Sequence, residues 1–386
     1  MKNQYNIWNK WDKLKTVVLG DIYNKEFYKD IKSKDTRDCF YRITEETKED
    51  LENFSNVLKD FGCTVLRPEI DPNDNIMNHV DQKGRMNMGR GGVPKPPLFP
   101  RDAQLVSGNS IVYTSIEPGD PWGKILREYN NKDVVDLRID GISGRRLDGF
   151  KKSGGVIHAP QYTMVGRDLY IDTNDRPIRQ WQQEELLKAV KDIRLNYLRI
   201  GGHNDGCFHT LKPGVIISLE DIQFYDKTFP DWDLLYLPEQ SWEKVNGFLK
   251  MKKKVVYISP TERSKEFVEL NAATQGKWWV PGEEDNDEFT MFVESWLNGW
   301  VGYTEETVFD VNCLVLDEHH VCVNNMNPKV IAYLKKHKME PVHVPWRHRY
   351  FFDGGLHCLT LDLYREGHMT DYFPARGDVG ITDLGV

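Results

Sequence analysis

Cys358 has neighbours that would suit a reactive thiol. Two glycines, Gly354 and Gly355, precede a His-Cys pair, and the alternating run LTLDLY follows it. Glycine permits close backbone approach, and a strand that begins just after Cys358 would fix the sulfur at its start. This placement favours a nucleophilic cysteine. A buried structural cysteine is the alternative at this stage, because cysteine is among the residues most often buried.

A histidine and a carboxylate lie two positions apart near the middle of the chain. His203 and Asp205 precede an apolar run that begins at Phe208. In extended backbone, residues two apart project to the same side, so both side chains could enter one pocket. Such a pair can carry out acid/base chemistry. A histidine with a purely structural role is the alternative.

The other cysteines and histidines suggest no metal chemistry. The six cysteines are dispersed without a CxxC pair, and a chain of 386 residues needs no disulfide framework. We expect thiols, most of which act as small hydrophobic residues in strands, as at Cys313 and Cys322. There is no HExxH motif, and the adjacent His319 and His320 fall in a turn. Glycine-rich phosphate-binding motifs are also missing, so we expect neither a metal nor a cofactor.

One structural unit recurs along the sequence. It consists of an apolar strand, a polar turn and a second apolar strand, and helical periodicity separates several of these hairpins. A hairpin-plus-helix unit repeated at ~45 to 100 residues predicts an α/β fold in which ββαβ modules form a closed ring, with sites at its centre. The hairpins begin at Ala103, Thr163, Cys207 and Asn312, and the helical segments begin at Glu45, Gln180 and Asn327.

Two segments interrupt this repeat. Residues 222–304 are rich in Trp, Lys and Glu, and we interpret them as an insertion or lid within a single domain spanning 1–386. A surface elaboration is the alternative. Residues 82–100 contain many glycines and prolines, and we interpret them as an active-site loop leading to Arg101 and Asp102. A plain connector is the alternative there.

Composition narrows the classes of function. With 39% hydrophobic and 12% aromatic residues, the chain can form a sizeable core. A net charge of -8 argues against a general nucleic-acid surface and favours a small cationic substrate. No apolar run approaches the ~20 residues of a membrane span, and the first residues lack the apolar core of a signal peptide. We therefore expect a cytoplasmic protein without nucleic-acid or membrane partners.

Taken in order, these segments resemble the amidinotransferase branch of the pentein superfamily, which includes glycine amidinotransferase. The matching motifs cover most of the chain except about 222–304. The resemblance implies a pseudo-fivefold α/β propeller of ββαβ units. The motifs are the first strand at Asn6–Gly20, the PRD motif at Phe99–Asp102, the HxDxxF segment at His203–Phe208, the final hairpin from Asn312, and the nucleophile motif at Gly354–Cys358.

The resemblance also implies a reaction. An amidino group would pass from an arginine-like guanidino donor to a primary amine. Cys358 would attack the guanidino carbon, Asp102 and Asp205 would bind the guanidinium, and His203 would protonate the departing amine. Water as acceptor would instead give a deiminase-like hydrolase, and a catalytically silent binding protein is a third reading. A homodimer is expected only from the family.

The chain departs from the family pattern where substrate is recognised. The acidic partner of the catalytic histidine is replaced by His158, whose imidazole could still hydrogen-bond to His203, and a second carboxylate is replaced by Gln161. The family's carboxylate-binding arginine falls at Ile222, and a serine ligand falls near Glu306. Lost negative charge weakens an ordinary arginine site, so we expect donor recognition to have changed.

Arg347 or Arg349, in the run that leads to Cys358, could supply the missing cation for substrate. We place Arg347 among the candidate substrate-binding residues, together with Arg101, which lies beside Asp102 in the PRD motif. A solvated surface arginine is the alternative for Arg347.

Overall fold

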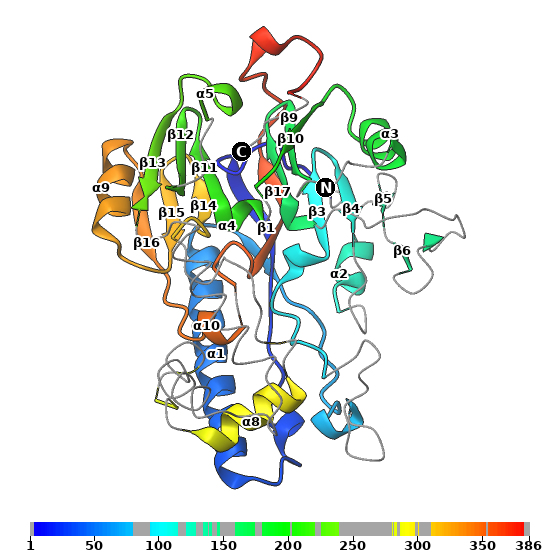
Figure 1. The fold of residues 1–386 in the computed structure, drawn as a ribbon, viewed down its shortest axis with the longest axis vertical. Helices are drawn as coiled ribbons and strands as arrows, with labels where there is room; N and C mark the ends of the chain where they lie inside the picture. The colour runs from blue at the N-terminus through cyan, green and yellow to red at the C-terminus, as the bar shows by residue number, and fades with distance from the viewer. Residues whose placement is uncertain are drawn as a thin grey trace, which may run out of the picture.

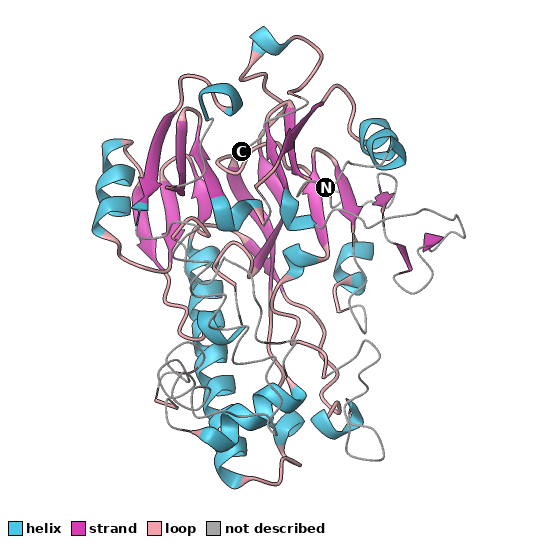
Figure 2. Cartoon of the chain, viewed as in Figure 1, coloured by secondary structure: helices cyan, strands magenta, loops and turns pink. Residues whose placement is uncertain are grey.

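The computed structural model describes most of the chain, and all structural statements below concern that part. It comprises residues 4–79, 93–114, 121–128, 134–137, 139–140, 145–146, 159–173, 180–200, 203–220, 225–238, 280, 282–283, 286–297, 300, 310–352 and 354–381. Its strands gather in one half of the molecule (Figure 2). Helix α1 (Lys34–Asp60) runs from beside the strands into the other half, where α8 (Asp287–Trp296) also lies (Figure 1).

Five three-stranded sheets with one topology make up the described strand region, beside a small two-stranded sheet (Figure 1). In each of the five, an antiparallel pair is followed by a crossover to a third strand that runs parallel to the second. Four of them are β3 (Gln104–Ser107), β4 (Ser110–Tyr113) and β5 (Val134–Asp136); β8 (Tyr162–Val165), β9 (Asp168–Asp172) and β10 (Arg194–Leu198); β11 (Phe208–Lys212), β12 (Val215–Leu219) and β13 (Asp233–Leu237); and β14 (Leu314–Asp317), β15 (His320–Val323) and β16 (Glu340–His343).

The fifth sheet joins the two ends of the chain. Strand β17 (Thr360–Glu366) pairs antiparallel with β1 (Lys13–Leu19), and β2 (Thr64–Leu66) pairs parallel with β1. The last strand therefore supplies the missing hairpin partner of the first module. Sequence alone predicted four hairpins and the pentein ring by resemblance, but the closing pair has no local turn to reveal it.

Each crossover between the second and third strands contains a helix. Helix α1 begins at its N-cap Ser33, whose hydroxyl accepts the Thr36 N–H. Helix α9 begins after Asn327, as predicted from the Asn-Pro pair, and the Asn327 side chain accepts the Lys329 N–H. The crossover helices are α1, α2 (Gly123–Arg127), α3 (Gln180–Ala189), α5 (Tyr225–Thr228) and α9 (Pro328–Lys336).

Three of the predicted hairpin turns depend on glycine. Gly108 and Gly166 both have φ of 57°, and Gly214 has φ of 81°, in the left-handed region that other residues rarely adopt. At Gly166 a Cβ would also lie only 2.0 Å from the Thr370 carbonyl oxygen. These glycines therefore fix where the hairpins turn.

The predicted insertion at 222–304 begins too early. Within it, α5 and β13 complete the β11-β12-β13 sheet, so the ring continues at least to Leu237. Farther along, α8 packs on α1 through Phe289 and Val293 in a shared apolar cluster. Strand β13 is the short apolar run DLLYL, which the polar, Trp-rich composition of the rest of 222–304 obscured. Whether the rest acts as a lid stays a prediction.

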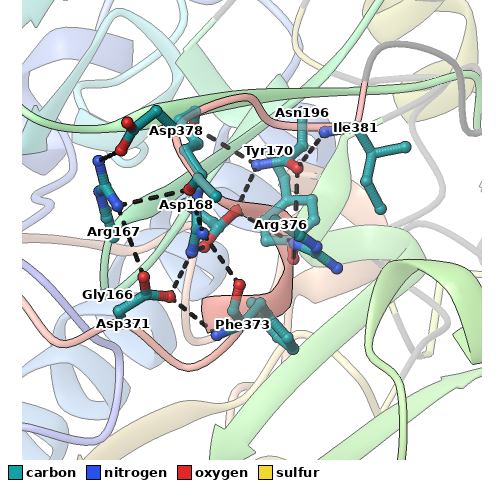
Figure 3. A network of polar contacts seen from close by, with 12 residues as sticks. Gly166, Arg167, Asp168, Tyr170, Asn196, Asp371, Phe373, Arg376, Asp378 and Ile381 are labelled. Atoms are coloured by element: carbon teal, nitrogen blue, oxygen red, sulfur yellow. Dashed lines mark hydrogen bonds and ion pairs between the residues drawn. The ribbon is translucent and has the colours of Figure 1, made fainter.

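After β17 the chain crosses the β8-β9-β10 sheet. The fully buried guanidinium of Arg194 bonds to Asp168 at 2.6 Å and to Asp371 at 2.5 Å, and it also donates to the carbonyls of Phe373 and Gly377. Figure 3 shows Asp168, Asp371 and Phe373 in this network. This network attaches the C-terminal tail, residues 367–381, to the ring.

The remaining described elements are short. None of the helices in the described ranges is long and apolar enough to span a bilayer. These elements are η1 (Lys25–Tyr28), η2 (Ile76–His79), η3 (Pro100–Asp102), β6 (Ile139–Asp140), β7 (Arg145–Arg146), η4 (Ala159–Gln161), α4 (Asn204–Cys207), α10 (Arg349–Phe352) and η7 (Pro374–Arg376).

Candidate active site

The candidate residues occupy equivalent places in the five modules. In every module, the segment just before the first strand of the antiparallel pair carries polar side chains, and contacts link several of these segments. The sequence therefore repeats one structural position five times around the ring. These leading segments are η3 before β3, η4 before β8, α4 before β11, Asn312 and Cys313 before β14, and His357 to Leu359 before β17.

The structure brings Cys358 and Asp205 together. The Cys358 Sγ lies 3.6 Å from Oδ2 of Asp205, within hydrogen-bonding reach for sulfur, although 153 positions separate the two residues. Both are buried, with Cys358 only 3% exposed. Burial alone would suit a structural cysteine, but a carboxylate against the sulfur gives it a polar environment. The sequence analysis placed His203 and Asp205 in extended backbone. In the structure Asp205 instead lies in the single helical turn α4, with His203 as its N-cap.

Asn312 is a further contact of Cys358. Its Nδ2 donates to the Cys358 Sγ at 3.0 Å, and its Oδ1 accepts the backbone N–H groups of His357 and Cys358 at 3.0 and 3.2 Å. The sequence analysis placed Asn312 only at the start of a hairpin. The signal that could have revealed it is its position directly before a module's first strand, which it shares with Asp102 and Cys358.

His357 belongs to the site as well, although sequence analysis treated it only as part of a motif. Its Nδ1 lies 2.5 Å from Asp205 Oδ2. Burial, and then the positive charges of Arg101 and Lys10, hold the pKa of His357 well below its ordinary value. We therefore treat the imidazole as neutral, with Nδ1–H donating to the carboxylate, which can only accept.

A second buried histidine faces His357. The His209 ring meets it edge to face at a centroid distance of 4.9 Å, and His209 is 0% exposed. Burial, and then the charges of Lys10 and Arg101, lower the pKa of His209 as well. Three ring nitrogens have no hydrogen-bond partner among the described residues: both nitrogens of His209 and the Nε2 of His357. The centre of the ring thus holds two neutral imidazoles.

Lys10 places a cation near the same carboxylate. It is 8% exposed, and burial lowers its pKa to about 8, an effect that the charge of Asp205 opposes and that of Arg101 reinforces. The lysine comes from the segment before β1, the strand that pairs with β17 after Cys358. Sequence analysis gave no role to this residue.

Arg101 holds the nucleophile turn from outside. Its Nη2 donates to Asp362 at 2.9 Å and its Nε donates to the His357 carbonyl at 3.2 Å. Burial raises the pKa of the Asp362 carboxyl, but the nearby charges of Arg365 and Arg101 outweigh it and leave the pKa below its ordinary value. These bonds engage Arg101 within the protein, so its contacts support the turn around Cys358.

Arg347 is engaged elsewhere. Its guanidinium bonds to Asp50 and Glu49 at 2.9 and 2.8 Å, and its Nη2 donates to the Glu46 carbonyl. The next residue, His348, contacts the Glu46 carboxylate at 2.7 Å. The structure thus joins Arg347 to the acidic face of α1, where it anchors the segment that leads to Cys358, and no described contact brings it to the nucleophile.

The other predicted site residues have mixed outcomes. Asp102 ends η3 and is half-buried. His203, also half-buried, is the N-cap of α4, two residues from Asp205. Gln161 helps to hold this segment, since its carbonyl accepts from Asn204 at 3.0 Å. His158, Ile222 and Glu306 lie outside the described residues, so the roles expected there stay predictions.

The remaining cysteines differ from Cys358. All six are buried and none forms a disulfide. Burial raises the pKa of Cys63 to about 11 and that of Cys313 to about 12, and it raises those of Cys39 and Cys322 further. Such thiols stay protonated and unreactive at neutral pH. In the described ranges, no group of three or more His, Cys, Asp and Glu residues could hold a metal ion.

Solved structures establish the class of fold. An amidinotransferase from Microseira wollei superposes with a TM-score of 0.57 at 18% identity, covering 96% of this chain and 99% of the other. Five repeated three-stranded sheets, with the last strand of the chain pairing with the first, define an α/β fold of the pentein type. No family model matches the chain.

Sequence relatives define the family within that class. The L-arginine:L-lysine amidinotransferase of Pseudomonas savastanoi pv. phaseolicola is 31% identical over 357 residues, covering 84% of this chain and 80% of the relative. Inosamine-phosphate amidinotransferase 1 of Streptomyces glaucescens is 20% identical, covering 95% and 98% respectively. The chain belongs to the amidinotransferase family.

Proposed function

We propose that this chain is a cysteine-dependent amidinotransferase that moves an amidino group from a guanidino donor to a primary amine. The observation that carries the proposal is the position of the Cys358 sulfur, 3.6 Å from the Asp205 carboxylate and 3.0 Å from the Asn312 amide, where the leading segments of the ring converge. The carboxylate offers a site for a guanidinium, and the sulfur lies beside it.

In the first half of the reaction, the guanidinium binds to Asp205, with Asp102 as a second expected carboxylate. The cation favours ionisation of the neighbouring thiol, whose proton the Asp205 carboxylate is placed to receive. The thiolate attacks the guanidino carbon and forms a C–S bond. The bond from that carbon to the donor's substituted nitrogen breaks, and His203 supplies the proton with which the amine departs.

In the second half, the acceptor amine takes the place of the departed one. Its nitrogen attacks the amidino carbon and gives up a proton to His203, and the C–S bond breaks with its electron pair returning to sulfur. The product is a new guanidine, and the thiolate takes back the proton held by Asp205, so the enzyme regains its starting state. In the deiminase-like hydrolase alternative, ammonia rather than the substituted amine leaves in the first half, and water then attacks the carbon bound to sulfur, which gives a ureido product.

The charges around the sulfur support a donor other than plain arginine. Lys10 already acts on Asp205, and the carboxylates expected at His158 and Gln161 are replaced by neutral or basic side chains. A second cation must therefore bind against partly compensated negative charge. The proposal specifies the guanidino group and leaves the rest of the donor to experiment.

A mass measurement tests the proposal directly. The protein is mixed briefly with arginine and with other guanidines, quenched in acid, digested and examined by mass spectrometry. An amidino adduct on the Cys358 peptide is expected with the true donor. With a labelled donor, release of the parent amine and labelling of an added amine indicate a transferase, whereas a ureido product indicates a hydrolase. No adduct and no turnover with any guanidine would favour a binding protein.

Cys358→Ser is expected to lower turnover at least about a thousandfold with the fold intact, because the hydroxyl is a far weaker nucleophile. The matched control is Cys63→Ser: the Cys63 thiol donates to the Leu14 carbonyl at 3.3 Å, a bond that serine can also make. Circular dichroism checks the fold of both variants. Activity retained in Cys358→Ser would exclude this cysteine as the nucleophile.

A further inference from the structure

Asn312 makes three contacts with the nucleophile turn from one side chain. It is 3% exposed and immediately precedes the β14 hairpin. Oδ1 accepts from two successive backbone N–H groups, those of His357 and Cys358, and Nδ2 reaches the Cys358 sulfur at 3.0 Å. No other described side chain bonds both to the backbone of this turn and to its sulfur.

The orientation of this amide is fixed by its partners. Backbone N–H groups can only donate, so the atom that faces them must be the carbonyl oxygen. The NH₂ group must then face the sulfur. A neutral thiol is a weak acceptor, whereas a thiolate is a strong one, so this N–H···S bond is stronger when the sulfur is ionised.

Gly355 leaves the space that the Asn312 side chain occupies. A Cβ on Gly355 would lie 2.5 Å from Asn312 Oδ1 and 2.7 Å from its Cβ. Any larger residue there would displace the amide from the turn. The second glycine of the nucleophile motif therefore makes room for Asn312.

Two side chains act on the sulfur in opposite senses. Asp205 Oδ2, at 3.6 Å, accepts from the thiol and repels a thiolate. The Asn312 N–H favours the thiolate. When a bound guanidinium neutralises Asp205, the carboxylate no longer repels the thiolate. The Asn312 N–H is then the described donor that stabilises the ionised sulfur.

We propose that Asn312 is a catalytic residue whose side-chain N–H stabilises the Cys358 thiolate, both as it attacks the guanidino carbon and as it leaves that carbon in the second half-reaction. This role rests on the proposed function for its chemical context. The hydrogen bond to sulfur itself can be tested without any substrate.

The test measures thiolate formation directly. The rate of Cys358 alkylation by iodoacetamide is followed from pH 5 to 10, with the modified peptide located by mass spectrometry. Asn312→Asp keeps an oxygen for the two backbone N–H groups and replaces the N–H donor with a second oxygen. The alkylation midpoint should rise by about one to two pH units, and turnover should fall about 10- to 100-fold, the range of a charge-assisted hydrogen bond.

Two further variants separate this role from a structural one. Gly355→Ala should shift the midpoint in the same direction by displacing the amide. Asn196→Asp changes a buried asparagine that donates to Asp168, and it should affect stability without moving the Cys358 midpoint. If folded Asn312→Asp and Gly355→Ala both keep the wild-type alkylation profile, the inference is wrong.

Failure of the proposed function would look different. In that case the wild-type protein would give no adduct with any guanidine, while the alkylation profiles would still show whether Asn312 stabilises the thiolate. If Asn312→Asp does not fold, Gly355→Ala decides: a raised midpoint supports the inference and an unchanged one overturns it.

Discussion

At the scale of single residues, the site is defined by charges buried close to one sulfur. Asp205 is the common partner: it accepts from Cys358 and from His357, and it lies within the field of Lys10. These contacts hold the buried carboxylate in one position beside the sulfur. Asp205, which would bind substrate, is therefore held in position by His357, which would not.

Lys10 is expected to reduce stability. Burial lowers its pKa from an ordinary 10.5 to about 8, so at neutral pH the charged lysine costs the folded state about 3 kcal/mol relative to the unfolded chain. Lys10→Met keeps the apolar stem and removes the charge. We predict an increase in the free energy of unfolding of up to about 3 kcal/mol, measured by urea denaturation at pH 7.

The same substitution should affect donor binding. With Lys10 removed, Asp205 faces one cation fewer, and a guanidinium should bind more tightly, seen as a lower KM for the donor. Lys13→Met, at an exposed position in β1, serves as the control and should change neither quantity. A destabilised Lys10→Met protein would show that the Asp205–Lys10 attraction outweighs the cost of burial.

At the scale of elements, the C-terminal tail is held to the ring by buried ion pairs rather than by strand pairing. Arg194 and Asp168 are both fully buried, and Arg376 adds a bond to Asp168 at 3.1 Å (Figure 3). The backbone bond from Tyr197 to the Ile381 carbonyl continues the attachment. Such a network is strongly destabilised when one partner is removed, because the other charge stays buried.

Arg194→Met should therefore release the tail. We expect a loss of about 3 to 5 kcal/mol in unfolding free energy and faster tryptic cleavage after Arg376. The control is Arg67→Met, because Arg67 bonds to Asp21 and makes no described contact with the tail. Equal protease resistance in wild type and Arg194→Met would show that the tail is held by other contacts.

At the scale of the whole molecule, the ring places buried neutral histidines at its centre, and this links stability to pH. His209 and His357 have pKa values lowered by burial and by the surrounding cations. Below about pH 6.5 the unfolded chain binds protons that the folded chain does not, so stability falls as pH decreases, by up to ~1.4 kcal/mol per pH unit for each histidine.

His209→Phe should flatten this dependence. The His209 ring has no described hydrogen-bond partner, so phenylalanine loses none and keeps the edge-to-face contact with His357. Denaturation midpoints measured from pH 4.5 to 7 should show a shallower slope than in wild type. His319→Gln, at an exposed turn, should keep the wild-type slope. An unchanged slope in His209→Phe would mean that His209 is already protonated in the folded protein.

The sequence by itself determined the local units and singled out Cys358 as the candidate nucleophile. The alternating apolar hairpins and the Asn-Pro helix start depend on neighbouring residues and are in the structure as predicted, whereas helix α1 begins at Lys34, before the predicted start at Glu45. The motif around Cys358 also identified the fold by resemblance. Local patterns carry this information because strand pairing across a short turn and helix capping involve residues close in the chain.

Only the tertiary structure decided which residues meet the sulfur. Asn312, His357 and Lys10 join Cys358 and Asp205 because five leading segments, far apart in sequence, end at one centre. For the same reason Arg347 was placed on α1, and β17 was found beside β1. A hydrogen bond between distant segments produces no recognisable sequence pattern in either segment, because its geometry depends on how the ring closes.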